Sequence, residues 1–245
     1  MLRTFCALAL VLAACGPRPG STIPLVEAPP TPLPATGLVL AQGEEMVWDV
    51  YWQAMQVGSA TLSVGAGEAR SSFSTTALAR AFAKVRYQLV TAMARGTATS
   101  SREGLTMSGD ASSIAVAIDG SHYAFDGGPQ LAVPGGTTLH TLHTAIGSMR
   151  AWSLGDAPPA YLWFVLRHTL YRLDVEHPTR DEAQGRRALK IHGTARAIDQ
   201  SIDPVDITIW LATTADRTPL RFVVVADGER VSAELTETNS AVAAN

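Results

Sequence analysis

Two Asp-Gly pairs constrain the fold more than any other feature of this sequence, because each interrupts a run of alternating apolar and polar residues. Asp119-Gly120 lies within SIAVAIDGSHYAF, and Asp227-Gly228 lies within LRFVVVADGERVSAEL. An Asp-Gly pair supplies the positive φ angles that a two-residue type I′ turn requires. The alternation on both sides is typical of strands with one apolar face. Both segments therefore predict β-hairpins, whose strands pair antiparallel.

The same period of two residues recurs through most of the chain. In EEMVWDVYW, one face carries Met46, Trp48, Val50 and Trp52, and similar alternation is found in VGSATLSV, TLYRLDVE, RALKIHG and VDITIWL. About 200 residues of this kind are enough for one domain with a sizeable core. The predicted fold class is mainly β, namely a strongly curved antiparallel sheet or a partly open β-barrel with one or two short helices.

Two segments depart from strand periodicity. In TLHTLHTAIGSMRAW, the residues Leu139, Leu142, Ile146 and Met149 follow helical spacing and predict a short helix. In TALARAFAKVRYQLV, the apolar residues fit a helix at first and alternate from Val85 onward, so this segment predicts a helix that turns into a strand.

The beginning of the chain predicts export and a lipid anchor. Residues 1–14 combine Arg3 with an uncharged apolar run that ends in two alanines, which is typical of a signal peptide. About ten apolar residues are too few to cross a bilayer, which takes about 20. LAAC resembles the lipobox of bacterial lipoproteins, in which the cysteine receives a diacylglycerol and, after cleavage, an N-acyl chain. Cys15 holds that position, and a plain secretory signal cleaved near a cysteine is the alternative.

The predicted organisation has four parts. A signal peptide over 1–14 precedes the lipidated cysteine and a Pro-rich tether over 15–42, a single β-rich domain over 43–237 and a flexible tail over 238–245. Cys6 is lost with the signal and Cys15 carries lipid, so the domain has no thiol for a disulfide. We expect a protein of the cell envelope, anchored to the outer membrane by lipid and facing the periplasm.

Charge argues against a nucleic-acid partner. Loss of Arg3 with the signal leaves 18 basic residues against 22 acidic ones, a net charge of about −4, and no basic cluster remains. Nucleic acid is bound by Lys and Arg side chains that neutralise phosphates.

The candidate chemical motifs are weak. His140 and His143 have a spacing that suits metal ligands, but a zinc site needs further ligands, so we interpret them as capping or surface histidines and predict no metal. Glu44 and Glu45 begin a strand and point to opposite faces, which favours solvated edge residues over paired acid-base work. No G-x-S-x-G elbow accompanies a base. We predict no catalytic residues, no cofactor beyond the acyl chains on Cys15, and no enzymatic activity.

The order of three segments resembles the bacterial domain-of-unknown-function family 3108. The first resembles its opening pattern G-E-x-x-x-Y-x-V-x-W followed by V-G-x-A-x-L, and is filled here by Gly43, Glu44, Trp48, Val50, Trp52, Val57, Gly58, Ala60 and Leu62. Thr144 to Arg150 approximates a middle S-x-x-x-x-x-R pattern. The last segment is matched by Trp210, Asp216, Arg217, Pro219, Leu220 and Gly228. The resemblance implies an envelope protein with a strongly curved antiparallel sheet, similar in outline to periplasmic lipoprotein carriers, and implies no reaction.

The aromatic side chains suggest where a ligand would bind. One apolar sheet face must be covered, and two short helices cover only part of it, so aromatic residues either fill a barrel or line a groove. The predicted apolar groove is lined by Trp48, Trp52, Trp163, Tyr171, Trp210 and Phe222. The favoured function is non-enzymatic binding of a lipid or other apolar envelope molecule on the concave face. The alternative is a structural or adaptor protein that docks an envelope partner by strand addition, at a sheet edge or around residues 157–161.

Overall fold

The computed structural model describes residues 30–33, 38–153, 157–198 and 203–239. The described strands are β1 (Thr31–Pro32), β2 (Glu45–Trp52), β3 (Met55–Gly65), β4 (Glu68–Thr75), β5 (Val85–Ala94), β6 (Thr97–Met107), β7 (Asp110–Asp119), β8 (His122–Phe125), β9 (Leu131–Ala132), β10 (Leu139–His140), β11 (Ala160–Leu166), β12 (Thr169–Val175), β13 (Thr179–Ala183), β14 (Arg186–Ala197), β15 (Val205–Ala212), β16 (Pro219–Ala226) and β17 (Glu229–Asn239). The α-helix is α2 (Leu142–Trp152), and two 3₁₀ turns span Ala79–Ala81 and Pro134–Gly136.

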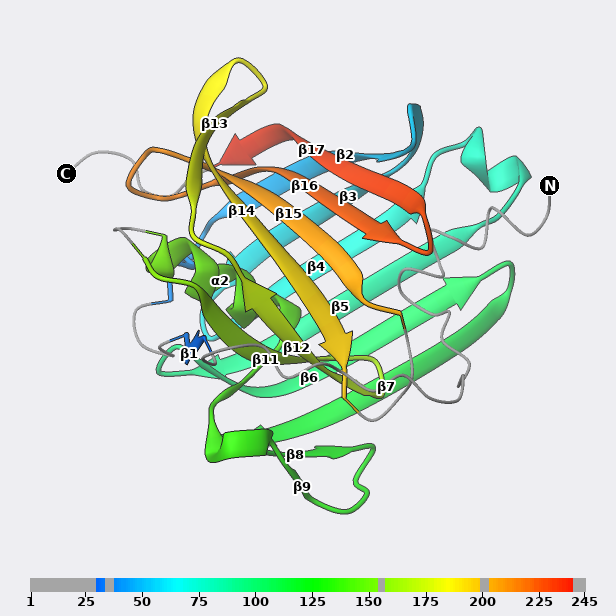
Figure 1. Cartoon of the computed structure of the whole chain (residues 1–245). Coiled ribbons are helices and arrows are strands. Elements are labelled where there is room, and N and C mark those ends of the chain that lie inside the picture. The colour runs from blue at the N-terminus through cyan, green and yellow to red at the C-terminus, as the bar shows by residue number, and fades with distance from the viewer. Residues whose placement is uncertain (1–29, 34–37, 154–156, 199–202, 240–245) are drawn as a thin grey trace.

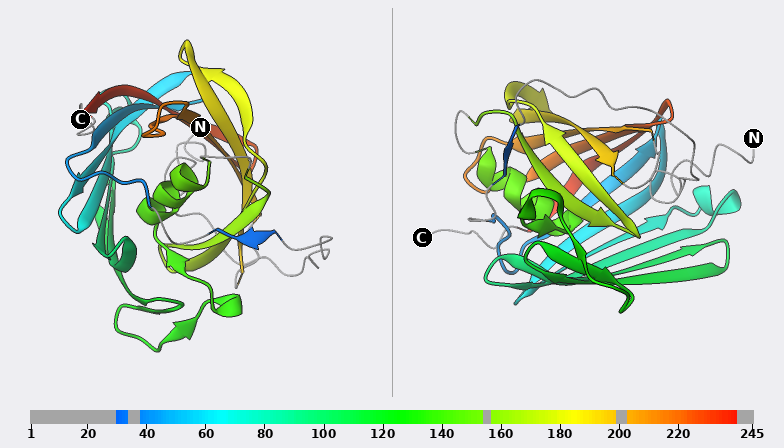
Figure 2. Two further views of the ribbon diagram at one scale, coloured as in Figure 1. Left: turned by 90° about the vertical axis from the view of Figure 1, so that its left-hand side faces the viewer. Right: turned by 60° about the horizontal axis from the view of Figure 1, so that its bottom comes forward.

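All described strands belong to one 17-stranded sheet (Figure 1). Its order is β1-β10-β11-β12-β13-β14-β15-β16-β17-β2-β3-β4-β5-β6-β7-β8-β9. The pairings are antiparallel except that β1 and β10 run parallel to β11. The sheet curves strongly and surrounds α2, as the left view of Figure 2 shows. The predicted fold class is confirmed.

The two Asp-Gly hairpins are present, but only one has the predicted turn. Ala226 pairs with Glu229, and Asp227 and Gly228 have φ angles of 51° and 76°, as a type I′ turn requires. In the first hairpin, Asp119 itself pairs with His122, so the two-residue loop begins at Gly120, whose φ is 60°. Glycine in the first loop position is typical of a type II′ turn, so the predicted turn is one residue out of place.

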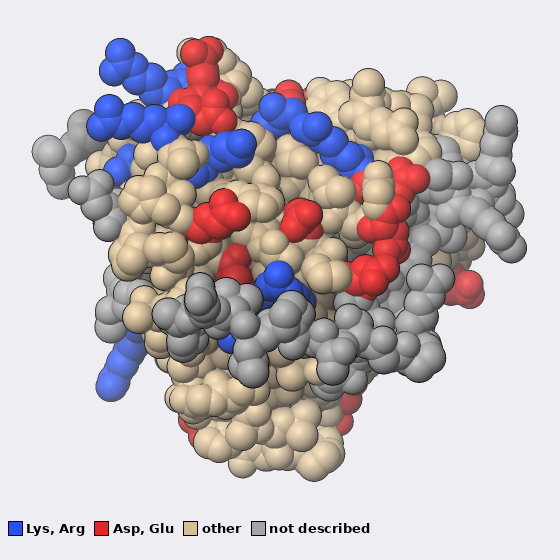
Figure 3. Space-filling view, in the orientation of Figure 1, with Lys and Arg blue, Asp and Glu red and all other residues tan. Residues whose placement is uncertain are grey.

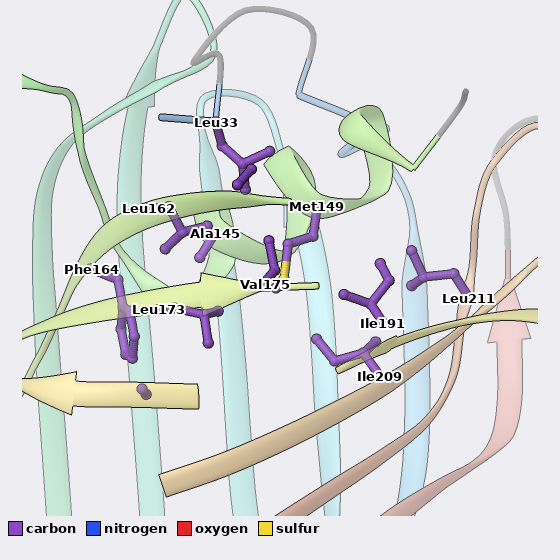
Figure 4. Packing of buried hydrophobic residues seen from close by; sticks show 12 residues of the cluster. Leu33, Ala145, Met149, Leu162, Phe164, Leu173, Val175, Ile191, Ile209 and Leu211 are labelled. Carbon is purple, nitrogen blue, oxygen red and sulfur yellow. The ribbon is translucent and has the colours of Figure 1, made fainter. Parts of the chain in front are cut away.

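Helix α2 occupies the inside of the curve. It begins with a capping box, in which Thr141 and Thr144 each accept a hydrogen bond from the backbone N–H of the other. Ala145 and Met149 pack against inner residues of β11, β12, β14 and β15 (Figure 4). The predicted helix is confirmed from Leu142, whereas Leu139, which the prediction included, lies in β10. Before β5, the predicted helix is only a three-residue 3₁₀ turn, and the predicted strand follows it.

The domain extends beyond its predicted limits on both sides. Thr31–Pro32, placed in the tether by sequence, pairs with Ala160 and Tyr161, and Leu33 is buried in the core next to α2. A proline is tolerated there because the strand lies at the edge of the sheet. At the other end, β17 continues to Asn239, which pairs with Glu45. The lipidation position Cys15 lies outside the described residues.

The two ends of the sheet meet by packing. On β11, Trp163 and Val165 point away from α2 and pack against Ile114 and Val116 of β7. The side chain of Glu103, buried on β6, fixes this overlap, because it accepts hydrogen bonds from the Arg167 backbone N–H at 2.8 Å and from the Tyr87 hydroxyl at 2.9 Å. Burial raises the pKa of Glu103. Packing of β11 against β7 therefore closes the curved sheet into a barrel.

Among the described residues, no helix combines the length and the apolar character that crossing a bilayer demands.

Candidate functional site

The exposure of inner-face side chains changes along the barrel axis. On β2, Met46, Trp48 and Val50 are buried, whereas Trp52 is half-buried. Residues directly opposite on neighbouring antiparallel strands share a face, so the same face can be followed through the sheet. The same change from buried to half-buried occurs on β12 (Leu173 to Tyr171), β15 (Ile209 to Ile207 and Val205), β16 (Leu220 to Phe222 and Val224) and β17 (Leu235 to Ala233 and Val231).

The buried and half-buried parts lie at opposite rims. The half-buried residues lie toward the turns at 53–54, 76–84, 108–109 and 227–228, which we call the open rim. Helix α2 covers the inner face toward the other end, the helix rim, where the 41–44 and 213–217 turns lie. An inner surface that is apolar, concave and half-buried at the open rim is the kind of surface that binds apolar ligands.

Four of the six predicted groove residues share the inner face. The Trp48 ring meets Phe222 edge to face with centroids 5.8 Å apart, and its indole N–H donates to the Pro219 carbonyl oxygen at 3.1 Å. Tyr171 stacks on Phe164 at 5.2 Å. Trp52 donates its indole N–H to Glu229 at 2.9 Å. Trp48 is thus a core residue near α2, while Trp52, Tyr171 and Phe222 lie in the half-buried region.

Trp163 and Trp210 are not brought to this surface. Trp163 lies on the other face of β11, in the overlap between the sheet ends. Trp210 is the neighbour of the inner residue Ile209, so it points outward, where its indole N–H donates to Asp181 at 2.9 Å and Arg221 lies 5.2 Å from its ring. The predicted grouping of six aromatic residues on one face therefore does not hold for these two.

The outer face around Trp210 is polar. Asp174 forms ion pairs with Arg172 and Arg196 at 2.8 and 3.0 Å. Figure 3 shows acidic and basic side chains interspersed over this side of the molecule. In this part of the sheet, the outer face carries charged side chains, whereas the inner face is apolar.

The two histidines of the predicted helix are buried, so their interpretation as capping or surface residues is wrong. His140 is 3 % and His143 is 1 % exposed. Nδ1 of His143 lies 2.8 Å from the Thr91 hydroxyl oxygen, which also donates to Thr141. Burial lowers the pKa of both imidazoles to about 4. The contact between His143 and Thr91 fastens α2 to β5.

Among the residues that the structure describes, no third metal ligand joins these histidines. Within the described ranges, no group of three or more His, Cys, Asp and Glu side chains is placed to hold a metal ion.

Glu44 is the largest departure from the sequence interpretation, because it is a buried ion-pair residue and not a solvated one. Both carboxylate oxygens accept hydrogen bonds from the Arg150 guanidinium, at 2.6 and 2.9 Å, and the two side chains are 1 % and 0 % exposed. Arg150 also donates from Nε to the backbone oxygen of Asp216 at 3.0 Å. The Asp216 carboxylate accepts from Thr214 and Thr218, and these hydrogen bonds lower its pKa against the effect of burial.

This ion pair joins the beginning, middle and end of the domain at the helix rim. Glu44, Arg150 and Asp216 come from the three segments that carry the resemblance to family 3108. Arg150 is fully engaged by protein groups, so it is a structural link that holds α2 in the barrel.

One solved structure supports the fold. The sequence matches no protein-family model and no curated protein. The structure is similar to a beta-barrel-like protein of domain-of-unknown-function family DUF1849 from Brucella abortus, at 5% identity and a TM-score of 0.57 over 80% of this chain and 96% of that one. A match to the lipoprotein LppX of Mycobacterium tuberculosis covers 86% of this chain and 92% of that one, at 11% identity and a TM-score of 0.25. The relationship to family 3108 stays a prediction.

Proposed function

We propose that this chain is a membrane-anchored envelope lipoprotein that binds a lipid or another apolar molecule on its inner face near the open rim. One observation carries the proposal: on five strands, the inner apolar residues pass from buried at α2 to half-buried at the open rim. Leaving large apolar side chains half-exposed to water is unfavourable, at about 25 cal/mol for each Å² of apolar surface. A bound acyl chain or similar molecule removes that surface from water.

Binding without turnover accounts for the polar groups better than catalysis does. The hydroxyl of Thr91 beside His143 has the spacing of a nucleophile and a base, but both side chains are at most 1 % exposed. The half-buried inner surface itself carries apolar side chains from β2, β12, β15, β16 and β17. A reaction needs a nucleophile, a base and an oxyanion donor within reach of substrate, and this surface provides no such set among the described residues.

The anchor in this proposal is the lipidated Cys15, and the location is the outer membrane with the domain facing the periplasm. The adaptor alternative receives less support, because the edge that it would use is already paired. The strand Thr31–Pro32 pairs with Ala160 and Tyr161, and Ala157 is buried. The other end of the sheet is the two-residue strand β9, which offers few backbone groups for strand addition.

Filling the inner surface tests the proposal. Ala233 is half-buried on the inner face, opposite Phe222 and Val50, and Ala117 is exposed on the outer face of β7. We expect lipid that co-purifies with the full chain, measured by solvent extraction and mass spectrometry, to fall about tenfold in Ala233→Phe, a change of about 1.4 kcal/mol. The matched variant Ala117→Phe leaves the lipid content unchanged.

The same mass spectra test the anchor. The proposal requires an N-terminal peptide that begins at Cys15 and carries the mass of a diacylglycerol and an acyl chain. A mature chain without co-purifying lipid, or equal lipid in both phenylalanine variants, contradicts the binding site.

A further inference from the structure

The segment between β4 and β5 exposes two large apolar side chains at the open rim. Leu78 is 65 % and Phe82 is 58 % exposed, more than any other large apolar side chain in the described part of the chain. They flank the 3₁₀ turn Ala79–Ala81, and both have helical backbone angles. Both side chains protrude from one short turn, so this turn presents two large apolar side chains to solvent.

This segment, residues 76–84, is packed against the barrel at the open rim, and we call it the rim loop. Ala79 is 2 % exposed and packs with Val50 and Val57, in a cluster that Trp52 and Phe73 border. The Thr76 backbone N–H donates to the Val57 carbonyl oxygen at 2.9 Å. The outward direction of Leu78 and Phe82 is therefore fixed by packing on the opposite side of the loop.

The charged residues in the sequence around the rim loop are all basic, although Asp110 and Glu229 lie on neighbouring strands at the same rim. Residues 69–102 contain no Asp or Glu, although the whole chain has a net charge of −3. Of the basic residues in this range, Arg80, Lys84 and Arg86 lie in or next to the rim loop, whereas Arg70 and Arg95 lie toward the other ends of β4 and β5. Arg80 and Lys84 belong to the rim loop itself, and both are exposed. Apolar side chains interleaved with basic ones are typical of segments that lie in the interface of an anionic bilayer.

We propose that the rim loop docks on an anionic lipid bilayer, with Leu78 and Phe82 among the upper acyl chains and with Arg80 and Lys84 at the headgroups. Docking places the half-buried inner surface against the membrane, so that an apolar molecule passes between bilayer and barrel without crossing water. The route rests on the proposed function, whereas the docking itself is a separate property of the rim loop.

A fluorophore attached to the rim loop tests the docking. The full chain carries Leu78→Cys or, as the matched control, Leu131→Cys, an exposed leucine 41 % accessible on β9. Each is labelled with nitrobenzoxadiazole and mixed with vesicles of phosphatidylethanolamine and phosphatidylglycerol, with the unsubstituted chain measuring any label on Cys6 or Cys15. We expect the emission of the label at residue 78, but not of the label at residue 131, to shift to the blue and to be quenched by lipids that carry a spin label on the acyl chain. The double substitution Arg80→Glu/Lys84→Glu is expected to lower the apparent affinity for these vesicles, measured by quenching, about tenfold.

Separate results bear on the two proposals. A lipid anchor alone holds the chain on vesicles but leaves both labels in water, so equal emission at positions 78 and 131 overturns the docking. If lipid still co-purifies with such a chain, the binding function stands without this route. Docking at position 78 in a chain that carries no lipid supports the membrane contact and removes the proposed ligand. Insertion on neutral phosphatidylcholine vesicles as strong as on anionic ones overturns the role of the basic residues.

Discussion

Replacing Arg150 with leucine is expected to lower the free energy of unfolding by about 3–5 kcal/mol, because it leaves the Glu44 carboxylate buried without its partner. The same loss is expected for Glu44→Leu, which strands the guanidinium. Urea unfolding followed by tryptophan fluorescence measures both effects. An exposed pair serves as the control: Arg70 and Glu68 are 2.7 Å apart with side chains 62 % and 37 % accessible. Arg70→Ala is expected to leave the free energy of unfolding nearly unchanged.

The double variant separates a structural pair from a functional one. Glu44→Leu/Arg150→Met removes both charges and is expected to recover most of the lost stability, since a buried ion pair is often no better than apolar side chains of similar size. Lipid content is expected to recover with it. A double variant as unstable as either single one would contradict this account of the pair.

Acid is expected to weaken the domain through its two buried histidines. Burial lowers the pKa of His140 and His143 from 6.5 to about 4, while the unfolded chain protonates them near 6.5. The folded chain therefore binds fewer protons between these values, so its stability is complete above pH 6.5 and falls as the pH drops toward 4. A lowering of this size corresponds to about 3 kcal/mol for each histidine.

Urea unfolding at pH values from 7.5 to 4.5 tests this dependence. The slope is expected to flatten in His140→Gln/His143→Gln and to stay unchanged in His122→Gln, whose side chain is exposed. The raised pKa of Glu103 acts in the opposite direction, and comparison with the parent chain cancels it because all variants share it. An equal slope in all three chains would show that the acid response has another origin.

The alternation of residues predicted the sheet well because it is a local signal. The strands, the position of α2 and the Asp227-Gly228 turn all follow from neighbours within a few residues. The alternation within one strand also contained information that the prediction of the groove did not use. In VDITIWL, Trp210 alternates with Ile209 and Leu211, so its outward direction follows from the period of two.

The misplaced residues depend on contacts between distant segments. Glu44 is 106 positions away from Arg150, and no local pattern distinguishes it from the exposed Glu45. Trp163 lies in the continuous apolar run AYLWFVL, which is apolar on both faces because the two sheet ends overlap there. The burial of Leu33 depends in the same way on an edge strand that pairs with residues far along the chain.

The position of a bound acyl chain tests the central claim most directly. A lipid with a diazirine in its acyl chain, loaded into the full chain and photolysed, marks the side chains that it contacts, and mass spectrometry of the peptides locates them. We predict adducts on the half-buried inner residues, with Trp52, Tyr171 and Val231 foremost, and none on the outward-facing Trp210. Adducts spread over the outer face, or none inside the barrel, would contradict the claim that the inner surface binds lipid.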